Sequence, residues 1–331
     1  MSMKKISLCI PTYNRCAALE ELIRSIACQN GHSFDVEVCI SDNASTDDTE
    51  MMIDIWSSRY SINIRYNKNK CNIGPDRNYL AAVALATGEY CWLMGSDDAL
   101  PSDALKYLEN YIDSKADIIL VDRAEMDYEM KEVTAFHRRW IEGESGLYYF
   151  SKLNDHLRYF EKCNSLGGVF SYLSSIIVRR DLWEKVIFDE KFIGSAYAHV
   201  FCLFDILTKT KNSCLQYIAK PIVLCRGGND FFASDGLVKR IEIDLAGYTK
   251  LANNFYSVPE VKKALLNVLA RERPWFYTSL VVGHYGTAED KKRVQGYYAE
   301  MDIPKAATKL VMKIGTIAYY FNNLAKKLLS K

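Results

Sequence analysis

Residues 89–105 read EYCWLMGSDDALPSDAL. The apolar run 90–94 ends at a polar turn that holds Asp97 and Asp98, and Pro101-Ser102-Asp103 then supplies the residue types that begin a helix. This pattern predicts a buried strand with two adjacent carboxylates at its carboxyl end. Neighbouring carboxylates raise each other's pKa unless a cation lies between them. The pair alone is compatible with a polar turn and helix cap as well as with a cation site.

Around this stretch, residues 1–122 alternate strand and helix patterns. The predicted strands are 6–10, 36–40, 62–66, 90–94 and 117–121, and the predicted helices are 16–29, 49–59, 76–86 and 102–111. An alternating order of this kind predicts an α/β fold with a doubly wound, mainly parallel sheet.

Beyond residue 123 the pattern is looser. Segments 172–178 and 214–225 resemble strands, and 200–207 resembles a helix. From Leu237 onward the pattern is helical, with interruptions at Pro259, Pro274, Gly286 and Pro304. We expect one domain over 1–232, with halves 1–122 and 123–232, and a C-terminal helical region over 233–331.

Composition excludes several classes of protein. The 331 residues are 49% hydrophobic and 25% charged with a net charge of +1, which gives no overall attraction to nucleic acid. Ten cysteines contain no CxxC pair, which fits a reducing cytoplasm better than a disulfide framework or a zinc site. The N-terminus lacks a signal-peptide pattern, and no apolar run approaches the roughly 18 residues of a membrane span. We therefore expect a cytoplasmic protein.

Three polar segments follow predicted strands. They are PTYNR (11–15), SDNASTD (41–47) and GSDDA (95–99). Ligands of doubly wound sheets bind beyond the carboxyl ends of the strands, where these segments would gather. The glycine patterns of dinucleotide-binding proteins and of P-loop enzymes are missing from the sequence.

The acidic residues of these segments suit a nucleotide site with a metal. Asp97 and Asp98 match Mg²⁺ or Mn²⁺, which use one or two protein carboxylates and take their other ligands from phosphate and water. Such a cation would neutralise a leaving diphosphate. Asp42 is compatible with accepting a hydrogen bond from a base or ribose, and capping of the helix that follows is the alternative.

Four motifs over residues 6–105 resemble the nucleotide-sugar domain of family 2 glycosyltransferases, which have the GT-A fold. They lie within ISLCIPTYNR, VCISDNASTDDT and NKNKCNIGPDRNYLAAVALATGEYCWLMGSDDALPSDAL. The resemblance implies a sugar-nucleotide donor, a divalent metal (Mn²⁺ or Mg²⁺) and transfer of a sugar to a hydroxyl group.

The resemblance also implies roles for individual residues. Asp98 corresponds to the metal ligand, and Asp97 lies toward the ribose or a bound water and is a second candidate ligand. The family's usual Asp-x-Asp-Asp motif has Gly95 at its first position here. The residues that correspond to the nucleotide-binding positions are Pro11, Thr12, Tyr13, Asn14, Asp42, Asn72, Gly74, Arg77, Asn78 and Asp97.

A second resemblance extends over most of the chain. GGVFSYLSS (167–175), FIGSAYAHVF (192–201), LCRGGND (224–230) and RERPW (271–275) resemble bacterial O-antigen dideoxyhexosyltransferases, the abequosyltransferases in particular. This implies CDP-abequose as donor and a mannose hydroxyl of a polyprenyl-diphosphate-linked O-antigen unit as acceptor, in lipopolysaccharide assembly. Transfer of another nucleotide-activated sugar, a nucleotidyltransferase and a non-catalytic sugar-nucleotide-binding module are the alternatives.

The catalytic base is where the sequence departs from the family. Inverting members carry an acidic residue before the helix that here begins near Val200, whereas this chain offers His199. His199 is compatible with a base, a third metal ligand or a structural histidine, and a retaining mechanism stays open. Arg226, between a strand and two glycines, is a candidate for contacting the diphosphate, or part of a solvated turn.

The last 28 residues, 304–331, contain six lysines and no acidic residue. Their apolar residues share one helical stripe, and most of the lysines lie about a quarter-turn away. This pattern predicts an amphipathic helix that either docks on the inner face of the plasma membrane or packs on its own domain or on a second subunit. The stripe consists of Leu310, Ile314, Ile317, Phe321, Leu324 and Leu328.

Overall fold

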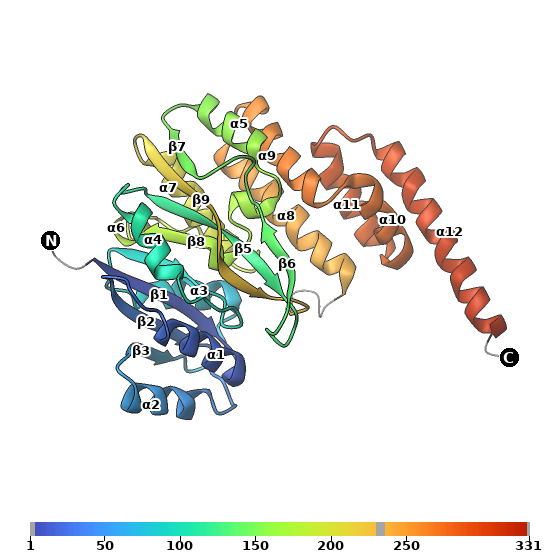
Figure 1. The fold of residues 1–331 in the computed structure, drawn as a ribbon. Coiled ribbons are helices and arrows are strands. Elements are labelled where there is room, and N and C mark those ends of the chain that lie inside the picture. Colours follow the sequence, from blue (N-terminus) through green and yellow to red (C-terminus); the bar gives the residue numbers. More distant parts are fainter. Residues whose placement is uncertain (1–3, 230–235, 330–331) are drawn as a thin grey trace. The chain divides into compact units, whose positions relative to one another are not determined.

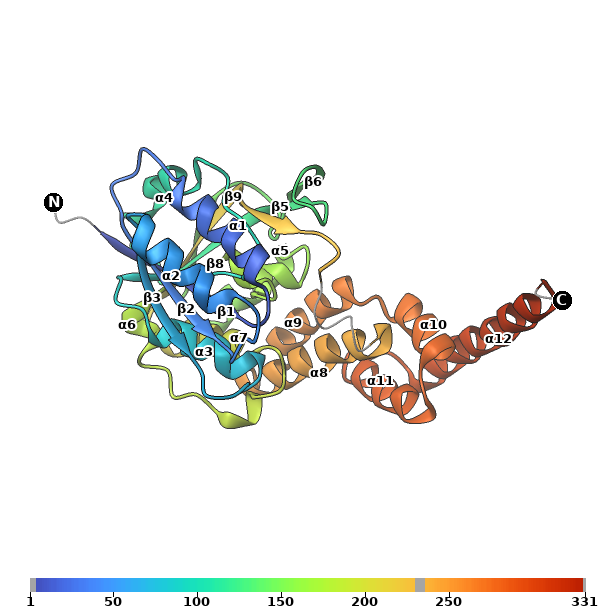
Figure 2. The same cartoon turned by 90° about the horizontal axis from the view of Figure 1, so that it is seen from below.

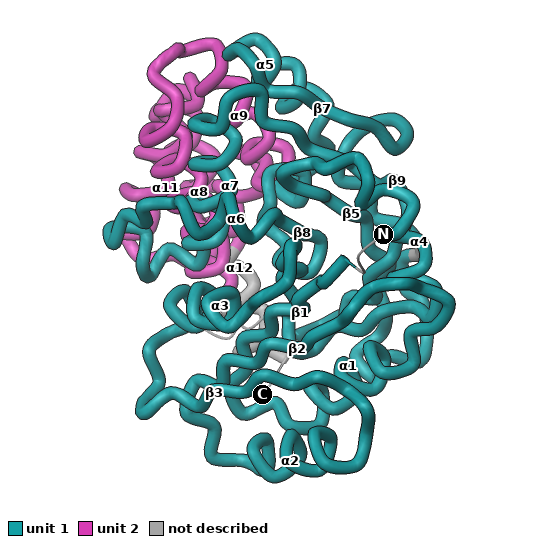
Figure 3. Tube along the Cα trace, turned by 90° about the vertical axis from the view of Figure 1, so that its left-hand side faces the viewer, with its two compact units in different colours: residues 1–229 teal, residues 230–331 magenta. Residues whose placement is uncertain are grey.

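The computed structural model describes residues 4–229 and 236–329 (Figure 1). Contacts divide the chain into two compact units, 1–229 and 230–331 (Figure 3). The first unit is an α/β domain and the second consists of helices.

The first half of the α/β unit follows the predicted alternation. All nine predicted elements are present, with ends within a few residues of those expected. They are β1 (Lys5–Thr12), α1 (Cys16–Ala27), β2 (Asp35–Asp42), α2 (Thr49–Arg59), β3 (Asn63–Lys68), α3 (Pro75–Ala84), β4 (Tyr90–Leu93), α4 (Ala104–Ile112) and β5 (Ile118–Met126).

The second half adds elements that the sequence pattern did not predict. Strands β6 and β7 and the helices α5 and α6 were missed, whereas α7 and β9 were expected. This half contains β6 (Val133–Arg138), β7 (Gly146–Phe150), α5 (Leu153–Lys162), β8 (Ile176–Arg179), α6 (Arg180–Trp183), α7 (Ala198–Lys209) and β9 (Ser213–Arg226).

The strands form one mixed sheet of order β3-β2-β1-β4-β8-β5-β9-β7, with β6 paired to β5. Most of its strands are parallel, as predicted, but β8 runs antiparallel between β4 and β5. The predicted strand 172–178 is shorter than expected, because 173–175 form a 3₁₀ turn before β8. Helices α1 and α4 cover one face of the sheet, and α3, α6 and α7 cover the other (Figure 3).

The hydrophobic core of this unit explains why the spacing of apolar residues in the sequence predicted its helices and strands. Helix α1 buries Leu19, Leu22, Ile23 and Ile26, which recur at helical spacing and pack against the sheet. The central strands β1 and β4 are buried along nearly their whole length. Strands covered on both faces appear in the sequence as continuous apolar runs.

Over its described residues, 236–329, the second unit contains five helices, which end close to the predicted interruptions. They are α8 (Leu237–Phe255), α9 (Pro259–Glu272), α10 (Trp275–Tyr285), α11 (Ala288–Glu300) and α12 (Lys305–Leu329) (Figure 2).

The RERPW motif has a structural role in this unit, because the Arg273 guanidinium lies 2.6 Å from the buried Asp244 carboxylate. None of the helices described combines the length and apolar character needed to cross a bilayer.

Candidate active site

The three polar segments leave the same edge of the sheet. Thr12 at the end of β1 pairs with Asp42 at the end of β2, which in turn pairs with Lys68 of β3. Strand β4 lies parallel to β1 on its other side. The carboxyl ends of these strands therefore present their loops together, at the position where doubly wound sheets bind ligands.

The first two loops are joined by Asn14. Its backbone N–H donates to Ser45 Oγ (2.9 Å), and its side-chain oxygen accepts from the Thr46 N–H (2.8 Å). Asn14 has φ of +50° and Ala44 has φ of +65°, in the left-handed region that non-glycine residues seldom adopt. This joint leaves Tyr13 partly exposed at the edge.

Asp42 is fully buried, and it does not cap α2. One carboxylate oxygen accepts from the Ser45 N–H (2.8 Å) and the other from the Tyr66 hydroxyl (2.7 Å). At the start of α2, Asp47 accepts instead from the Thr49 hydroxyl (2.6 Å). Asp42 therefore shapes the second loop, and Tyr66 is a partner that the sequence did not reveal.

Asn72 and Gly74 belong to the loop after β3. The Asn72 side-chain oxygen accepts from Asn43 Nδ2 (2.8 Å) and from the Gly74 N–H (2.9 Å). Asn43 also accepts from the Ile73 N–H (2.8 Å). These amides connect the loop after β3 to the loop after β2.

Asn78 and Arg77 point to different partners. The buried Asn78 amide accepts from Ser41 Oγ (2.8 Å) and donates to the Ser41 and Thr12 carbonyl oxygens at 3.0 and 3.3 Å. Asn78 therefore fastens α3 to the ends of β1 and β2. Arg77, which was expected at a nucleotide-binding position, forms an ion pair with Glu190 (2.5 Å).

Asp98 is buried within the loop of residues 95–99 that follows β4, which we call the acidic loop. It accepts hydrogen bonds from the Ser174 hydroxyl and from the Arg226 N–H (3.3 Å). Ser174 also accepts from the Gly95 N–H (2.8 Å), so that one hydroxyl holds both ends of the turn. Burial, followed by the charge of Asp97, raises the pKa of Asp98 to about 6.

Asp97 faces a set of cations and amides. One carboxylate oxygen lies 2.7 Å from the Arg15 guanidinium and accepts from Asn229 Nδ2 (2.6 Å). Arg226 donates from Nε to the Asp97 carbonyl oxygen (3.0 Å) and forms an ion pair with Glu21. The structure thus brings Arg226 beside the acidic pair. Asp230, the last residue of the LCRGGND motif, lies outside the described residues.

Gly95 has a physical reason to replace the family's usual aspartate. A Cβ atom at position 95 would lie 3.0 Å from an Asp98 oxygen, 3.1 Å from an Asp97 oxygen and 3.4 Å from Ser174 Oγ. A side chain there would have to displace the carboxylates. Glycine therefore permits the close turn that holds Asp97 and Asp98 as they are.

His199 does not join the two aspartates in a metal cluster. Within 4–229 and 236–329, no three His, Cys, Asp or Glu side chains are grouped so that they could hold a metal ion. Asp97 and Asp98 fit a hard cation whose remaining ligands come from a diphosphate and water.

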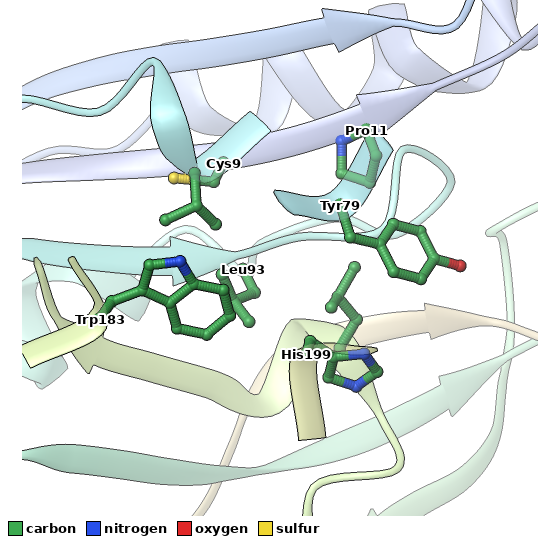
Figure 4. A pocket seen from close by; sticks show the side chains of 8 residues that line it. Cys9, Pro11, Tyr79, Leu93, Trp183 and His199 are labelled. Carbon is green, nitrogen blue, oxygen red and sulfur yellow. The ribbon is translucent and has the colours of Figure 1, made fainter. Parts of the chain in front are cut away.

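His199 lies in an apolar pocket between α7, α3 and the sheet (Figure 4), with Cys9, Pro11, Tyr79, Val83, Leu93, Leu173 and Trp183. Its Nε2 is 3.0 Å from the Phe170 carbonyl oxygen, and Nδ1 has no hydrogen-bond partner among the described residues. Burial lowers the pKa of His199 to about 4. The ring is therefore neutral at pH 7 and is a weaker base than an ordinary histidine.

Asp76 positions the segment that carries His199, although the sequence gave no role to it. Its buried carboxylate accepts from the N–H groups of Gly194 (2.7 Å), Ala196 (3.1 Å) and Ala198 (3.3 Å). Ala196 has φ of +66°, so the carboxylate holds a strained turn at the start of α7. Adjacency to Arg77 within GPDRN was the available signal.

Arg123 is a second residue that the sequence did not indicate. Its guanidinium carbon lies 4.0 Å from the centre of the Tyr172 ring and 5.0 Å from that of Trp140. The positive charge of Arg123 favours the ionised form of Asp98. A partly buried arginine on β5 thus contributes to the electrostatics of the acidic loop.

Comparison with known proteins agrees with this geometry. The family model for glycosyl transferase family 2 matches residues 7–179. The chain is 47% identical over 320 residues to abequosyltransferase RfbV of Salmonella typhimurium, with 96% of each chain covered. It is 25% identical to the poly(ribitol-phosphate) beta-N-acetylglucosaminyltransferase TarS of Staphylococcus aureus, over 91% of this chain and 58% of TarS.

Solved structures share the fold. TarS 1–349 with UDP-GlcNAc has a TM-score of 0.62 at 16% identity, and covers 94% of this chain and 91% of its own. The mannosyltransferase PcManGT of Pyrobaculum calidifontis, in complex with GDP-Man and Mn²⁺, has a TM-score of 0.56 at 16% identity over 99% and 89% of the two chains. The chain therefore belongs to glycosyl transferase family 2 and is a glycosyltransferase with the GT-A fold.

Proposed function

We propose that this glycosyltransferase moves abequose from CDP-abequose to a mannose hydroxyl of a polyprenyl-diphosphate-linked O-antigen unit. The observation that carries the proposal is the 47% identity with the Salmonella abequosyltransferase over 96% of both chains. Identity of this extent includes the residues of both units, not only the nucleotide-sugar half. The enzyme would act at the cytoplasmic face of the membrane that holds the lipid-linked acceptor.

The nucleoside would lie across the loops after β1, β2 and β3. Tyr13 is exposed there and offers a ring for stacking on a base. Each carboxylate oxygen of Asp42 accepts one protein hydrogen bond and has a second lone pair, which could accept from the cytosine amino group or the ribose. Pro11, Asn14, Asn72 and Asn78 would hold these loops in shape.

The diphosphate would lie over the acidic loop. Asp98, with Asp97 beside it, would hold Mn²⁺ or Mg²⁺ between the protein and the phosphates. When bound, the cation would supply positive charge against the diphosphate that leaves. Arg15 and Arg226 already lie next to Asp97 and would add further positive charge at the same point.

His199 would act on the sugar and acceptor side through its position and not through its charge. The ring is neutral, and its free Nδ1 is a hydrogen-bond acceptor. His199 would orient a hydroxyl as a neutral group instead of acting as an ordinary histidine base. The anomeric configuration of the product decides between inversion and retention.

Calorimetry with nucleoside diphosphates tests the donor class. We expect CDP to bind more tightly than UDP or GDP, and Mn²⁺ to strengthen its binding in the wild type but not in Asp98→Asn. Preferred binding of UDP or GDP would favour another sugar nucleotide. Binding of a nucleoside diphosphate without any transfer of sugar would favour a non-catalytic sugar-nucleotide-binding module.

A further inference from the structure

Helix α12 has one face that is fixed by packing. Thr308, Val311, Met312 and Gly315 are buried on it. A Cβ atom at Gly315 would lie 2.3 Å from the Leu280 carbonyl oxygen, so the backbones of α12 and α10 are in close contact. Such an approach allows little rotation of α12 about its axis.

The opposite face of α12 exposes apolar side chains. Leu310, Ile314 and Ile317 are 63%, 49% and 55% exposed. At about 100° per residue they lie roughly 150° around the helix from the buried residues. The predicted stripe therefore does not pack on its own unit in this part of the helix. The side chains from 319 onward lie outside those described.

Two exposed aromatic residues lie in the first turn of α10. A Cβ atom at Gly283 would lie 2.2 Å from the Met312 carbonyl oxygen, and Gly315 meets Leu280, so α10 and α12 run antiparallel. The first turn of α10 is thus directed toward the C-terminal half of α12, which projects past α10 and α11 in both views (Figures 1 and 2). Phe276 and Tyr277, in that first turn, are 52% and 65% exposed.

Charge decides what can cover this surface. Residues 304–331 contain six lysines and no acidic residue, and Lys309 and Lys313 are exposed beside the apolar stripe. Two copies of the helix would bring like charges together without acidic partners. An anionic lipid surface provides both the negative charge for the lysines and an apolar interior for the stripe.

We infer that the exposed face of α12 docks the enzyme on anionic membranes. The helix would lie in the plane of the interface, with Leu310, Ile314 and Ile317 inserted below the headgroups. This inference depends on the two faces of α12 and not on which sugar the enzyme transfers. Its role would be to hold the active site near a lipid-linked acceptor.

The test compares binding of the full-length protein to phosphatidylglycerol-containing vesicles and to pure phosphatidylcholine vesicles by cosedimentation. We expect binding only to the anionic vesicles, and a decrease with added salt. Leu310→Gln with Ile314→Gln and Ile317→Gln should abolish binding. Lys309→Gln with Lys313→Gln should weaken it by about fivefold per lysine.

Matched controls lie in the α/β unit. Ile187 is 85% exposed, and Ile187→Gln should leave binding unchanged. Lys106→Gln with Lys211→Gln removes the same charge from two other exposed lysines and should have less effect than the α12 pair. All variants should transfer sugar to a soluble mannoside as the wild type does, which separates this proposal from that of the donor.

Two results would overturn the inference. One is equal binding of the wild type and the triple glutamine variant to anionic vesicles. The other is a wild-type dimer in sedimentation velocity that the triple variant converts to a monomer, with no vesicle binding by either, because α12 would then be a subunit interface. If circular dichroism shows that the triple variant is unfolded, the vesicle binding of the Lys309/Lys313 variant and of its Lys106/Lys211 control decides the question.

Discussion

Asp98 is held by residues that are far away in the sequence. Ser174 is 76 positions from it and Arg226 is 128. The motif around Asp98 could be recognised from the sequence because it directly follows a buried strand. Its partners could not, because contacts of this separation depend on how β8 and β9 enter the sheet. The same limit applies to Arg15, Tyr66 and Arg123.

Ser174→Ala tests whether that hydroxyl positions Asp98. The change leaves the Gly95 N–H without its acceptor and removes a donor to Asp98, at a cost of about 1–3 kcal/mol of folding stability. We expect turnover to fall as well. Ser175→Ala is the matched control, because Ser175 is equally buried but accepts from the Trp140 indole N–H. Equal turnover of the two variants would argue against a positioning role.

Asp42→Ala tests the proposed nucleoside contact. A lost hydrogen bond to a charged group is worth about 1.5–3 kcal/mol, so we expect CDP affinity to fall by roughly one to two orders of magnitude. Tyr66→Phe removes the internal partner and keeps the carboxylate, and should retain most of the affinity. If both variants lower the melting temperature and neither changes CDP binding, Asp42 only shapes the loop.

The burial of His199 should make the free energy of unfolding depend on pH. Its pKa is lowered by burial to about 4, from 6.5 in an unfolded chain, so between these values the unfolded state binds more protons. Stability is therefore complete above pH 6.5 and is lost as the pH falls toward 4, by about 2 kcal/mol at pH 5.

Denaturant unfolding of the wild type and His199→Gln at pH 7 and pH 5 measures this loss. The variant should lose about 2 kcal/mol less than the wild type between the two values. His156, whose pKa burial also lowers to about 4, is present in both proteins and cancels. Identical losses would show that His199 is not protected from protonation in the folded state.

At the scale of elements, the helices and strands that bury the most side chains were the ones that the sequence predicted. The strands and helices of 1–122 and the helices after Leu237 were found because their apolar residues recur regularly or are bounded by proline and glycine. Strands β6 and β7 were missed because several of their residues are exposed and each strand pairs with a single neighbour, β6 with β5 and β7 with β9. The antiparallel insertion of β8 leaves no local signal, since it depends on pairing with β4 and β5.

The junction between α3 and α7 gives a prediction about two elements. Asp76→Ala would leave three N–H groups at the start of α7 without their acceptor, and should cost about 2–4 kcal/mol. We expect turnover to fall more than CDP affinity, because the displaced segment carries His199. Asp76→Asn, which keeps one acceptor oxygen, should lie between Asp76→Ala and the wild type. An equal fall of turnover and of CDP affinity would mean that Asp76 acts on donor binding instead.

At the scale of the whole molecule, the two units have different tasks. The α/β unit gathers the loops after β1, β2, β3, β4 and β9 into one site, and the helical unit presents an exposed apolar and basic face. Motifs in the sequence specified the first. For the second, the sequence predicted the apolar stripe and its lysines, but whether Leu310, Ile314 and Ile317 are exposed depends on which side of α12 meets α10.

The most direct measurement is transfer from CDP-abequose to a mannose-terminated acceptor, with the product identified by mass spectrometry and NMR. We predict that the wild type forms an abequosyl-mannose linkage and requires a divalent cation. Asp98→Asn should abolish transfer while its thermal unfolding stays cooperative, since asparagine has the same size and keeps one of the two acceptor oxygens. Full activity of Asp98→Asn, or transfer from UDP- or GDP-sugars in place of CDP-abequose, would contradict the account.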